Sequence, residues 1–427
     1  MIKIYRYADM NPEEIFNRKV EQNDEVEGIV AGIIDRVRKE GDAALLDYAE
    51  QFDHCRLEVL EVSAQEIQAA FERTDKVFIQ TLEMAAQNIR AFHRRQIRQN
   101  FMINDQEGVV LGQRVMPIEK VGLYVPGGTA SYPSTVLMDA IPAQLAGVKQ
   151  IIMVSPPDRQ GKIADPILAA AKVAGVNRIF KVGGAQAVAA LAYGTQSLPK
   201  VDKIVGPGNI FVATAKRRVF GVVDIDMIAG PSEILVLADG SCNPAYVAAD
   251  MLSQAEHDKL ASAVLVTDSE ELAQAVQAQL EVQIPKLDRA DIARVSIDNN
   301  GKIIVADSMS RAISISNLIA PEHLEVCVDD PFACLNAITN AGSVFLGKNV
   351  PEALGDYFAG PNHTLPTSGT ARFSSPLSVD DFVKKSSFIY YTKEALGKVQ
   401  DRVVDFAMRE GLQAHANSVA IRFREEE

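Results

Sequence analysis

The sequence predicts an α/β protein with parallel sheets, and two observations support this fold class. From about Val121 onward, short apolar runs that end in glycine or proline alternate with alanine-rich stretches. Strand, small-residue turn and helix, repeated along a chain, are typical of a parallel sheet with helices on both faces. The chain has 427 residues, which exceeds the roughly 100–200 residues of one domain, so we expect more than one such body.

The first hundred residues are expected to be helical. Residues 26–51 carry apolar residues at helical spacing, and Gly41 interrupts the pattern. A second amphipathic stretch covers residues 64–100. It follows Ser63, which stands three residues before Glu66, and this spacing predicts a capping box at the start of a helix.

The strand and turn pattern then occurs in two series. The first series occupies 122–135, 150–157, 178–186 and 203–209. The second follows a turn at Gly230, with strands expected at 233–239, 262–269, 302–308 and 342–347. The last residues, 378–427, are expected to form a helix at 394–410 and a short strand at 418–422. That tail is short for a domain, so it should pack on another body or another subunit.

The composition excludes several classes of function. There are 56 acidic residues and 43 Lys and Arg, giving a net charge of −13. No basic face is therefore expected for nucleic acid or an anionic membrane surface. The N-terminus lacks a signal-peptide core, and no apolar run approaches the ~18 residues of a membrane span. Four scattered cysteines without a CxxC pair predict a reduced, cytoplasmic protein.

The glycine-rich turns are candidates for phosphate contacts. In a parallel sheet they would gather at the carboxyl edge, where glycine lets the backbone approach a ligand and the next helix offers its positive end. The dinucleotide pattern GxGxxG is absent, since Gly206 and Gly208 match its first two glycines and the third is lacking. The turns are therefore either simple tight turns or nucleotide contacts.

Any transition-metal site in this chain would depend on its six histidines. Gln254 and His257 stand three residues apart in a predicted helix, where an imidazole beside an amide oxygen could form half of a zinc site. The alternative is a helix-end histidine that pairs with Glu256. Both interpretations remain open on spacing alone.

Two further motifs combine histidine with a carboxylate. Glu322 and His323 precede a predicted strand and could act as a general acid–base pair, or could form an exposed polar turn. Asp356 and His363 lie in one polar loop, where the aspartate could be a metal ligand and the histidine a hydrogen-bonding group. A structural turn is the alternative for this loop.

The remaining histidines carry less information. His415 follows Glu410 just before the terminal segment, and taken alone this pair indicates only a polar surface. His54 and His93 are expected to be structural, with His93 solvated on its helix.

The thiols offer a different chemistry. Cys327 and Cys334 lie near His323 in the sequence, so a thiol-dependent aldehyde dehydrogenase without metal is an alternative function. Buried, unreactive thiols are the simpler interpretation of all four residues, Cys55 and Cys242 included.

Taken together, these motifs closely resemble those of the histidinol dehydrogenase family over nearly the whole chain. The most specific stretch runs from Ile225 to His257 and contains IAGPSEILV and LSQAEH. The other matching segments occur in the same order, namely VGLYVPGG, VGGAQAVAALAYGT, VGPGN, APEHLE, GDYFAGPNHTLPT, FSSPLSVDDFVK and EGLQAHANSVAIR.

The resemblance implies a zinc-dependent, NAD-linked oxidation of L-histidinol to L-histidine through an aldehyde, the last step of histidine biosynthesis. It implies one zinc per subunit with the ligands Gln254, His257, Asp356 and His415. Glu322 and His323 would be the acid–base pair. Substrate would contact Ser232, His363 and Glu410, together with His323 and the four zinc ligands. NAD would lie against Tyr124, Gln186 and Asn209.

The resemblance also implies two incomplete Rossmann-like α/β domains of the aldehyde-dehydrogenase type, one inserted in the other. We expect an extension at 1–21, a main domain at 22–123 and 232–377, an NAD domain at 124–231 and a C-terminal extension at 378–427. The implied assembly is a homodimer in which the C-terminal segment reaches the active site of its neighbour. Pro361 and Thr364 depart from the family pattern, which has Thr and Val, and these changes affect loop geometry only.

Overall fold

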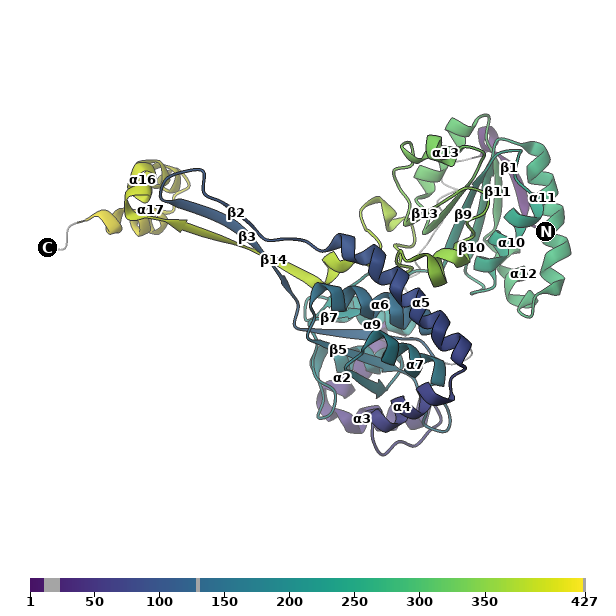
Figure 1. Cartoon of the computed structure of the whole chain (residues 1–427), viewed down its shortest axis with the longest axis horizontal. Helices are drawn as coiled ribbons and strands as arrows, with labels where there is room; N and C mark the ends of the chain where they lie inside the picture. Colours follow the sequence, from purple (N-terminus) through teal and green to yellow (C-terminus); the bar gives the residue numbers. More distant parts are fainter. Residues whose placement is uncertain (11–23, 128–130, 425–427) are drawn as a thin grey trace. The chain divides into compact units, whose positions relative to one another are not determined.

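The computed structural model describes residues 1–10, 24–127 and 131–424, and the chain forms two compact units (Figure 1). The first unit consists of Met1–Gln96 and Ile118–Phe382, and the second of Ile97–Pro117 and Val383–Glu427. Within the described ranges, the first unit holds two parallel sheets with helices on both faces, which confirms the predicted fold class.

One sheet of the first unit has five parallel strands in the order β6-β5-β4-β7-β8. These strands are β4 (Lys120–Tyr124), β5 (Gln150–Ser155), β6 (Arg178–Lys181), β7 (Lys203–Val205) and β8 (Asp224–Ile225). One face is covered by α2 (Asp24–Glu40), α3 (Asp42–Phe52), α8 (Gly184–Tyr193) and α9 (Ile210–Val219). The other is covered by α4 (Ala64–Arg73), α5 (Lys76–His93), α6 (Pro133–Ala146) and α7 (Asp165–Ala174).

The N-terminal helices are built largely as the sequence predicts. Gly41 separates α2 from α3, and the capping box forms, since Ser63 Oγ accepts a hydrogen bond from Glu66 N at 3.2 Å and Glu66 Oε2 accepts one from Ser63 N at 2.9 Å. The expected helix at 64–100 is two helices, because Asp75 caps a new one.

The packing of these helices differs from the grouping expected from sequence. We grouped 22–123 with 232–377, but α2 packs on α8 and α9, and α4 packs on α7, so these helices cover the five-stranded sheet. The apolar residues of α2 to α5 pack beside those of the helices that connect the strands of this sheet, so together they bury both of its faces. The division of the chain into domains stays a prediction.

The second sheet of the first unit has six parallel strands in the order β1-β11-β10-β9-β12-β13. They are β1 (Lys3–Arg6), β9 (Glu233–Ala238), β10 (Ser262–Thr267), β11 (Lys302–Val305), β12 (His323–Cys327) and β13 (Ser343–Leu346). One face packs on α10 (Pro244–Ala255), α11 (Glu270–Gln283) and α12 (Ala290–Asn299), and the other on α13 (Met309–Ile319) and α14 (Pro331–Leu335). Of the expected extension at 1–21, residues 11–21 lie outside the described residues.

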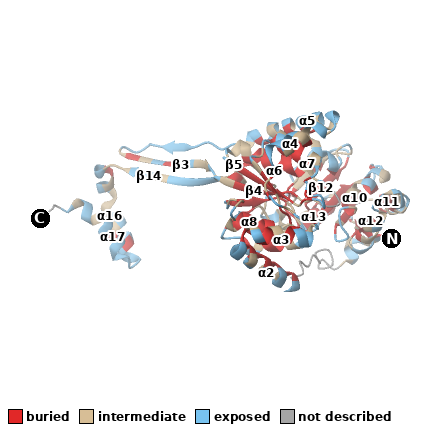
Figure 2. Cartoon of the chain, turned by 90° about the horizontal axis from the view of Figure 1, so that it is seen from below, coloured by how far each residue is buried: buried red, intermediate tan, exposed pale blue. Residues whose placement is uncertain are grey.

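Shorter elements connect these layers. A short helix, α15 (Glu352–Leu354), continues into a π-helical turn at Gly355–Ala359. Turns of 3₁₀ helix lie at Tyr7–Asp9, Arg94–Gln96, Ile284–Lys286, Thr370–Arg372, Val379–Phe382 and Ile421–Phe423. Strands and the inward faces of helices form the buried interior of the first unit (Figure 2).

The second unit is a three-stranded antiparallel sheet with two helices. Its strands, in the order β14-β3-β2, are β2 (Phe101–Ile103), β3 (Val109–Pro117) and β14 (Val383–Tyr391). The helices are α16 (Lys393–Arg409), as expected, and α17 (Gln413–Ala420). The strand expected at 418–422 is therefore wrong, because the alanine-containing segment before it continues as helix through Ala420.

Candidate active site

The predicted acid–base pair enters β12, next to the start of β9. His323 is in register with Ile234, so Glu322 and His323 lie beside Glu233 at the amino ends of two neighbouring strands. Ligands of open parallel sheets usually bind at the carboxyl edge. The six-stranded sheet therefore carries its candidate catalytic groups at the opposite edge.

Both members of the pair are buried, with Glu322 8% and His323 3% exposed. Glu322 Oε2 accepts a hydrogen bond from Glu233 N at 2.8 Å and lies 3.7 Å from His323 Nδ1. His323 Nδ1 lies 3.0 Å from the carbonyl oxygen of Glu233. The alternative of an exposed polar turn is therefore wrong, since these side chains are fixed inside the protein.

Burial and charge change the proton affinity of both groups. Burial raises the pKa of Glu322 to about 8, because an ionised carboxylate is poorly solvated there. Burial alone would lower the pKa of His323, but the carboxylates of Glu322, Asp356 and Glu352 outweigh it and raise that pKa to about 10. With these raised pKa values, Glu322 and His323 both carry a proton near neutral pH, and either can exchange that proton with a reacting group.

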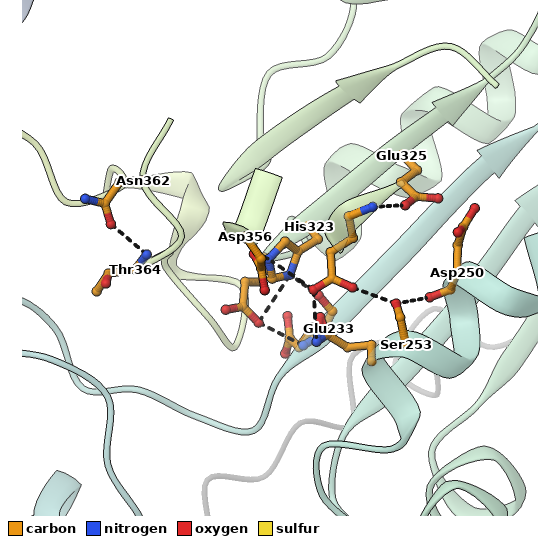
Figure 3. A network of polar contacts seen from close by, with 11 residues as sticks. Glu233, Asp250, Ser253, His323, Glu325, Asp356, Asn362 and Thr364 are labelled. Atoms are coloured by element: carbon orange, nitrogen blue, oxygen red, sulfur yellow. Dashed lines mark hydrogen bonds and ion pairs between the residues drawn. The ribbon is translucent and has the colours of Figure 1, made fainter. Parts of the chain in front are cut away.

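A second group of donors faces the other ring nitrogen of His323. Its Nε2 lies 3.5 Å from Asp356 Oδ1 and 3.9 Å from Glu352 Oε1. One donor atom from each of these three residues lies within 4.8 Å of the others, a separation at which one metal ion could bind them together. Figure 3 shows Asp356 and His323 pointing toward one another.

The π-helical turn sets the position of Asp356. The turn begins at Gly355, where a Cβ atom would lie 2.5 Å from the ring of Phe345, so only glycine lets the turn pack this closely on β13. The imidazole of His323 lowers the pKa of the Asp356 carboxyl against the opposing effect of burial. Asp356 is thus ionised at neutral pH, as a metal ligand must be.

Gln254 lies in the last turn of α10 and points into the same group. Its side chain is 1% exposed. The Nε2 atom donates a hydrogen bond to Glu352 Oε1 at 3.5 Å, and among the described residues the Oε1 atom has no hydrogen-bond partner. A buried amide oxygen without a partner is costly, and a metal ion at this position would satisfy it.

His257 follows α10, one residue beyond its C-cap. The residue is exposed, yet the protein atoms around it displace enough water to lower the pKa of the imidazole, while Asp356 acts in the opposite direction. A lowered pKa keeps the ring neutral at pH 7, the form that binds metals. His323 also acts on this pKa, so His257 belongs to the same electrostatic group.

A cavity of about 270 Å³ adjoins the group and is lined by Asp356 and His363, among others. Burial lowers the pKa of His363, and Asp356 partly offsets this effect. Ser232, the other predicted substrate contact of the first unit, is partly buried immediately before β9. Its neighbour Gly230 donates a hydrogen bond to Thr367 Oγ1 at 2.7 Å, so this segment adjoins the loop that carries His363.

Glu352 is the residue of this group that the sequence reading missed. It is 2% exposed and accepts a hydrogen bond from Ser253 Oγ at 2.6 Å. Its backbone N–H donates to Glu325 Oε1 at 2.7 Å. The signal that could have found it is its place four residues before Asp356, the spacing that puts two carboxylates on one face of a helical turn.

Glu410 and His415 belong to the second unit. Glu410 is the C-cap of α16 and His415 lies in α17, and both are exposed. The first unit by itself therefore supplies Gln254, His257 and Asp356 of the predicted ligand set.

The predicted NAD contacts follow strands of the five-stranded sheet. Tyr124 ends β4, and its hydroxyl accepts a hydrogen bond from Gly184 N, 3.1 Å away, at the start of α8. Gln186 is buried in the first turn of α8, and the exposed Asn209 caps α9. These residues lie at the carboxyl ends of β4, β6 and β7, as the glycine-rich turns predicted.

The cysteines and His93, which we expected from the sequence to be structural, lie inside the protein. All four cysteines are free and buried. His93 is fully buried with its Nδ1 2.7 Å from Gln96 Oε1, so the expectation that it is solvated is wrong. It lies on the inward face of α5, where the helix packs on the sheet. In the ranges that the structure describes, no helix is both long and apolar enough to span a membrane.

A buried acid–base pair beside a mixed oxygen and nitrogen donor set, on an α/β fold, defines the active site of an enzyme. The sequence model of the family described as histidinol dehydrogenase matches residues 16–423. The chain belongs to the histidinol dehydrogenase family, and it is therefore a dehydrogenase.

Individual relatives agree with this assignment. The chain is 53% identical over 428 residues to a histidinol dehydrogenase of Clostridium acetobutylicum, with 99% of each chain covered. It is 56% identical over 402 residues to that of Listeria monocytogenes, with 94% of each covered. The crystal structure of histidinol dehydrogenase from Elizabethkingia anophelis superposes with a TM-score of 0.94 at 41% identity, covering 99% of this chain and 98% of that one.

Proposed function

We propose that this enzyme oxidises L-histidinol to L-histidine through the aldehyde, with zinc and NAD as its cofactors, in the last step of histidine biosynthesis. The observation that carries the proposal is the position of the buried Glu322–His323 pair. In this chain of the histidinol dehydrogenase family, the pair lies against Asp356 and Glu352, and Glu352 accepts a hydrogen bond from the buried amide of Gln254.

The donors of the first unit fit a zinc ion. Gln254 offers an unsatisfied amide oxygen, Asp356 a carboxylate and His257 a neutral imidazole. This mixed oxygen and nitrogen set is one that zinc accepts, with a position left for substrate. When bound, zinc would orient the substrate and NAD would accept the electron pair that leaves the reacting carbon.

The protein groups would then move the protons. His323 Nε2 would take the hydroxyl proton of histidinol as the carbon is oxidised, while Nδ1 stays on the carbonyl oxygen of Glu233. In the second oxidation, Glu322 would remove a proton from the water that adds to the aldehyde. Acidic groups around the site also suit a substrate that carries an ammonium group.

The predicted domain roles and the dimer extend this proposal. The five-stranded sheet would bind NAD at Tyr124, Gln186 and Asn209, and the six-stranded sheet would hold zinc and substrate. His415 and Glu410 would complete the site from the neighbouring subunit. Exposed apolar side chains on the second unit support this arrangement, because they need a partner surface. They include Ile389, Phe406, Leu412 and Ile421.

An NADH-release assay tests the proposal. Histidinol and NAD should give two NADH per substrate by absorbance, and the signal should disappear after chelation and return with zinc. No NADH from histidinol, or full activity after all metal has been removed, would overturn it.

A further inference from the structure

The loop that carries His363 is tied to helix α6 of the five-stranded sheet on both sides of the histidine. Asn362 Nδ2 donates a hydrogen bond to the carbonyl oxygen of Met138 at 2.7 Å. Thr364 Oγ1 donates to Asp139 Oδ1 at 3.2 Å, and Thr364 N donates to Asn362 Oδ1 at 2.8 Å. Figure 3 shows this last contact. The anchors are buried, so each is a hydrogen bond that water cannot replace.

Asp139 also faces the glycine-rich turn after β7. A Cβ atom on Gly206 would lie 3.2 Å from Asp139 Oδ2 and 2.1 Å from the carbonyl oxygen of Tyr124. Gly206 has a φ of 114°, a conformation that favours glycine. The carboxyl group of Asp139 therefore lies between the loop of His363 and the turn at which the predicted NAD contacts Tyr124 and Asn209 are found.

A separate ion pair holds that turn in place. Lys216 pairs with Asp226 and donates a hydrogen bond to the carbonyl oxygen of Gly206 at 3.0 Å. Asp226 Oδ2 accepts one from Gly206 N at 2.8 Å. Lys216 and Asp226 thus neutralise each other, and Asp139 has no cation of its own within this buried cluster of described residues.

The surroundings of Asp139 disfavour the charged form of its carboxyl group. Asp139 is 0% exposed, and burial, reinforced by the charge of Asp226, raises the pKa of its carboxyl well above the ordinary value. In its neutral form, the Asp139 carboxyl group can accept the hydrogen bond from the Thr364 hydroxyl without the cost of a buried charge.

We propose that Asp139 is a positioning residue, which holds Thr364 and thereby sets the position of the His363 imidazole in the cavity that His363 and Asp356 line. The inference rests on the proposed function, because it takes His363 as a substrate contact. It also gives a role to Thr364, because its hydroxyl group is the partner of the buried carboxyl of Asp139.

The test separates positioning from simple stability. Thr364→Val keeps the side-chain volume and removes the hydroxyl. It should raise the KM for histidinol about three- to tenfold with little change in kcat, because one buried hydrogen bond contributes about that much free energy. Asp139→Ala should raise this KM at least as much. Asp139→Asn keeps an acceptor oxygen without a charge and should restore the KM to within about twofold of the wild type.

Ser296→Ala is the matched control. Ser296 is buried on α12 and donates a hydrogen bond to the carbonyl oxygen of Ala261 at 2.8 Å, with no part in the site. It should lower the thermal midpoint to a similar extent as Thr364→Val and leave the KM unchanged. If Asp139→Ala fails to fold, Thr364→Val and Asp139→Asn still decide the question.

A double-mutant cycle with His363→Ala completes the test. If Thr364 acts through His363, Thr364→Val should have no further effect on KM in the His363→Ala background. The proposal is overturned if the two effects multiply, if Asp139→Asn is as impaired as Asp139→Ala, or if Thr364→Val behaves like Ser296→Ala. A wild-type enzyme that releases no NADH from histidinol would instead refute the proposed function, so the two failures are distinct.

Discussion

The main chain of Glu233 orients the imidazole of His323, since its carbonyl oxygen lies 3.0 Å from Nδ1. A carbonyl oxygen only accepts hydrogen bonds, so Nδ1 must carry the proton. The lone pair of the neutral ring is then on Nε2, the nitrogen that faces Asp356. The N–H of the same residue holds Glu322 at 2.8 Å. One residue of β9 thus fixes both members of the acid–base pair.

Replacing Glu322 should separate the two oxidation steps. Glu322→Gln can keep the hydrogen bond from Glu233 N through its amide oxygen, but it cannot remove a proton from water. A general base contributes about 10²–10⁴-fold, so we expect a loss of that order for histidinaldehyde as substrate and less than about tenfold for the alcohol step. Single-turnover NADH formation from each substrate measures the two losses, and equal losses would contradict this division of labour.

The pH dependence of turnover follows from the same pair. Burial raises the pKa of Glu322 to about 8, and the surrounding carboxylates, acting against burial, raise that of His323 to about 10. Both residues act as bases in their deprotonated forms, which accumulate as the pH rises through these values. Turnover should therefore increase from pH 7 to pH 9, and a flat or falling profile over that range would refute the assignment.

The fold was largely predictable from sequence because its signals are local. Glycine-ended apolar runs give the strands, and side-chain caps such as Ser63 mark the helix starts. Which sheet α2 to α5 cover was not predictable, because any apolar helix face can pack on either sheet. The segment at 418–422 was misjudged because a few β-branched residues count for little beside an alanine-containing helix.

The candidate site was predictable only in part. Motifs singled out Glu322, His323 and Asp356, and the structure brings these three together. Glu352 was missed because its only sequence signal, the four-residue spacing to Asp356, is common on exposed helices, and its burial appears only in the structure. The hydrogen bond between Asp139 and Thr364 joins residues 225 positions apart, and sequence spacing predicts contacts only between residues close together in the chain.

The thiols should be dispensable. Cys327 and Cys334 are both buried. The neighbouring Cys242 side chain, together with burial, raises the pKa of Cys327, and burial raises that of Cys334, so neither forms a thiolate readily. We expect the double replacement by alanine to leave kcat for histidinol within about twofold, since a buried small side chain costs stability rather than chemistry. Loss of aldehyde oxidation in a folded double variant would instead favour the thiol-dependent mechanism.

His257→Asn should remove the bound metal. Asparagine cannot supply the neutral imidazole nitrogen, so the loss of one of the four proposed ligands should lower zinc affinity by orders of magnitude. Elemental analysis after dialysis measures the zinc content. His54→Asn is the matched control, because His54 is exposed and has no predicted role in the site. Full zinc occupancy in His257→Asn would remove this residue from the ligand set.

Glu352 should tune metal affinity through Gln254. Its carboxylate accepts hydrogen bonds from Gln254 Nε2 at 3.5 Å and from Ser253 Oγ at 2.6 Å. Glu352→Gln has one acceptor oxygen, so one of these bonds is lost along with a negative charge beside the site. We expect zinc affinity to fall about 10–100-fold, as it does when a group that orients a ligand is removed.

Competition with a chromophoric chelator measures the zinc affinity of this variant independently of turnover. Ser253→Ala removes the other bond to Glu352 without changing any charge, so its effect should be in the same direction and smaller. Glu271→Gln, an exposed change of the same chemistry, should leave zinc binding unaltered. If Glu352→Gln binds zinc as tightly as Glu271→Gln does, Glu352 has no role in orienting Gln254, and the orientation of that amide must come from the packing of α10 alone.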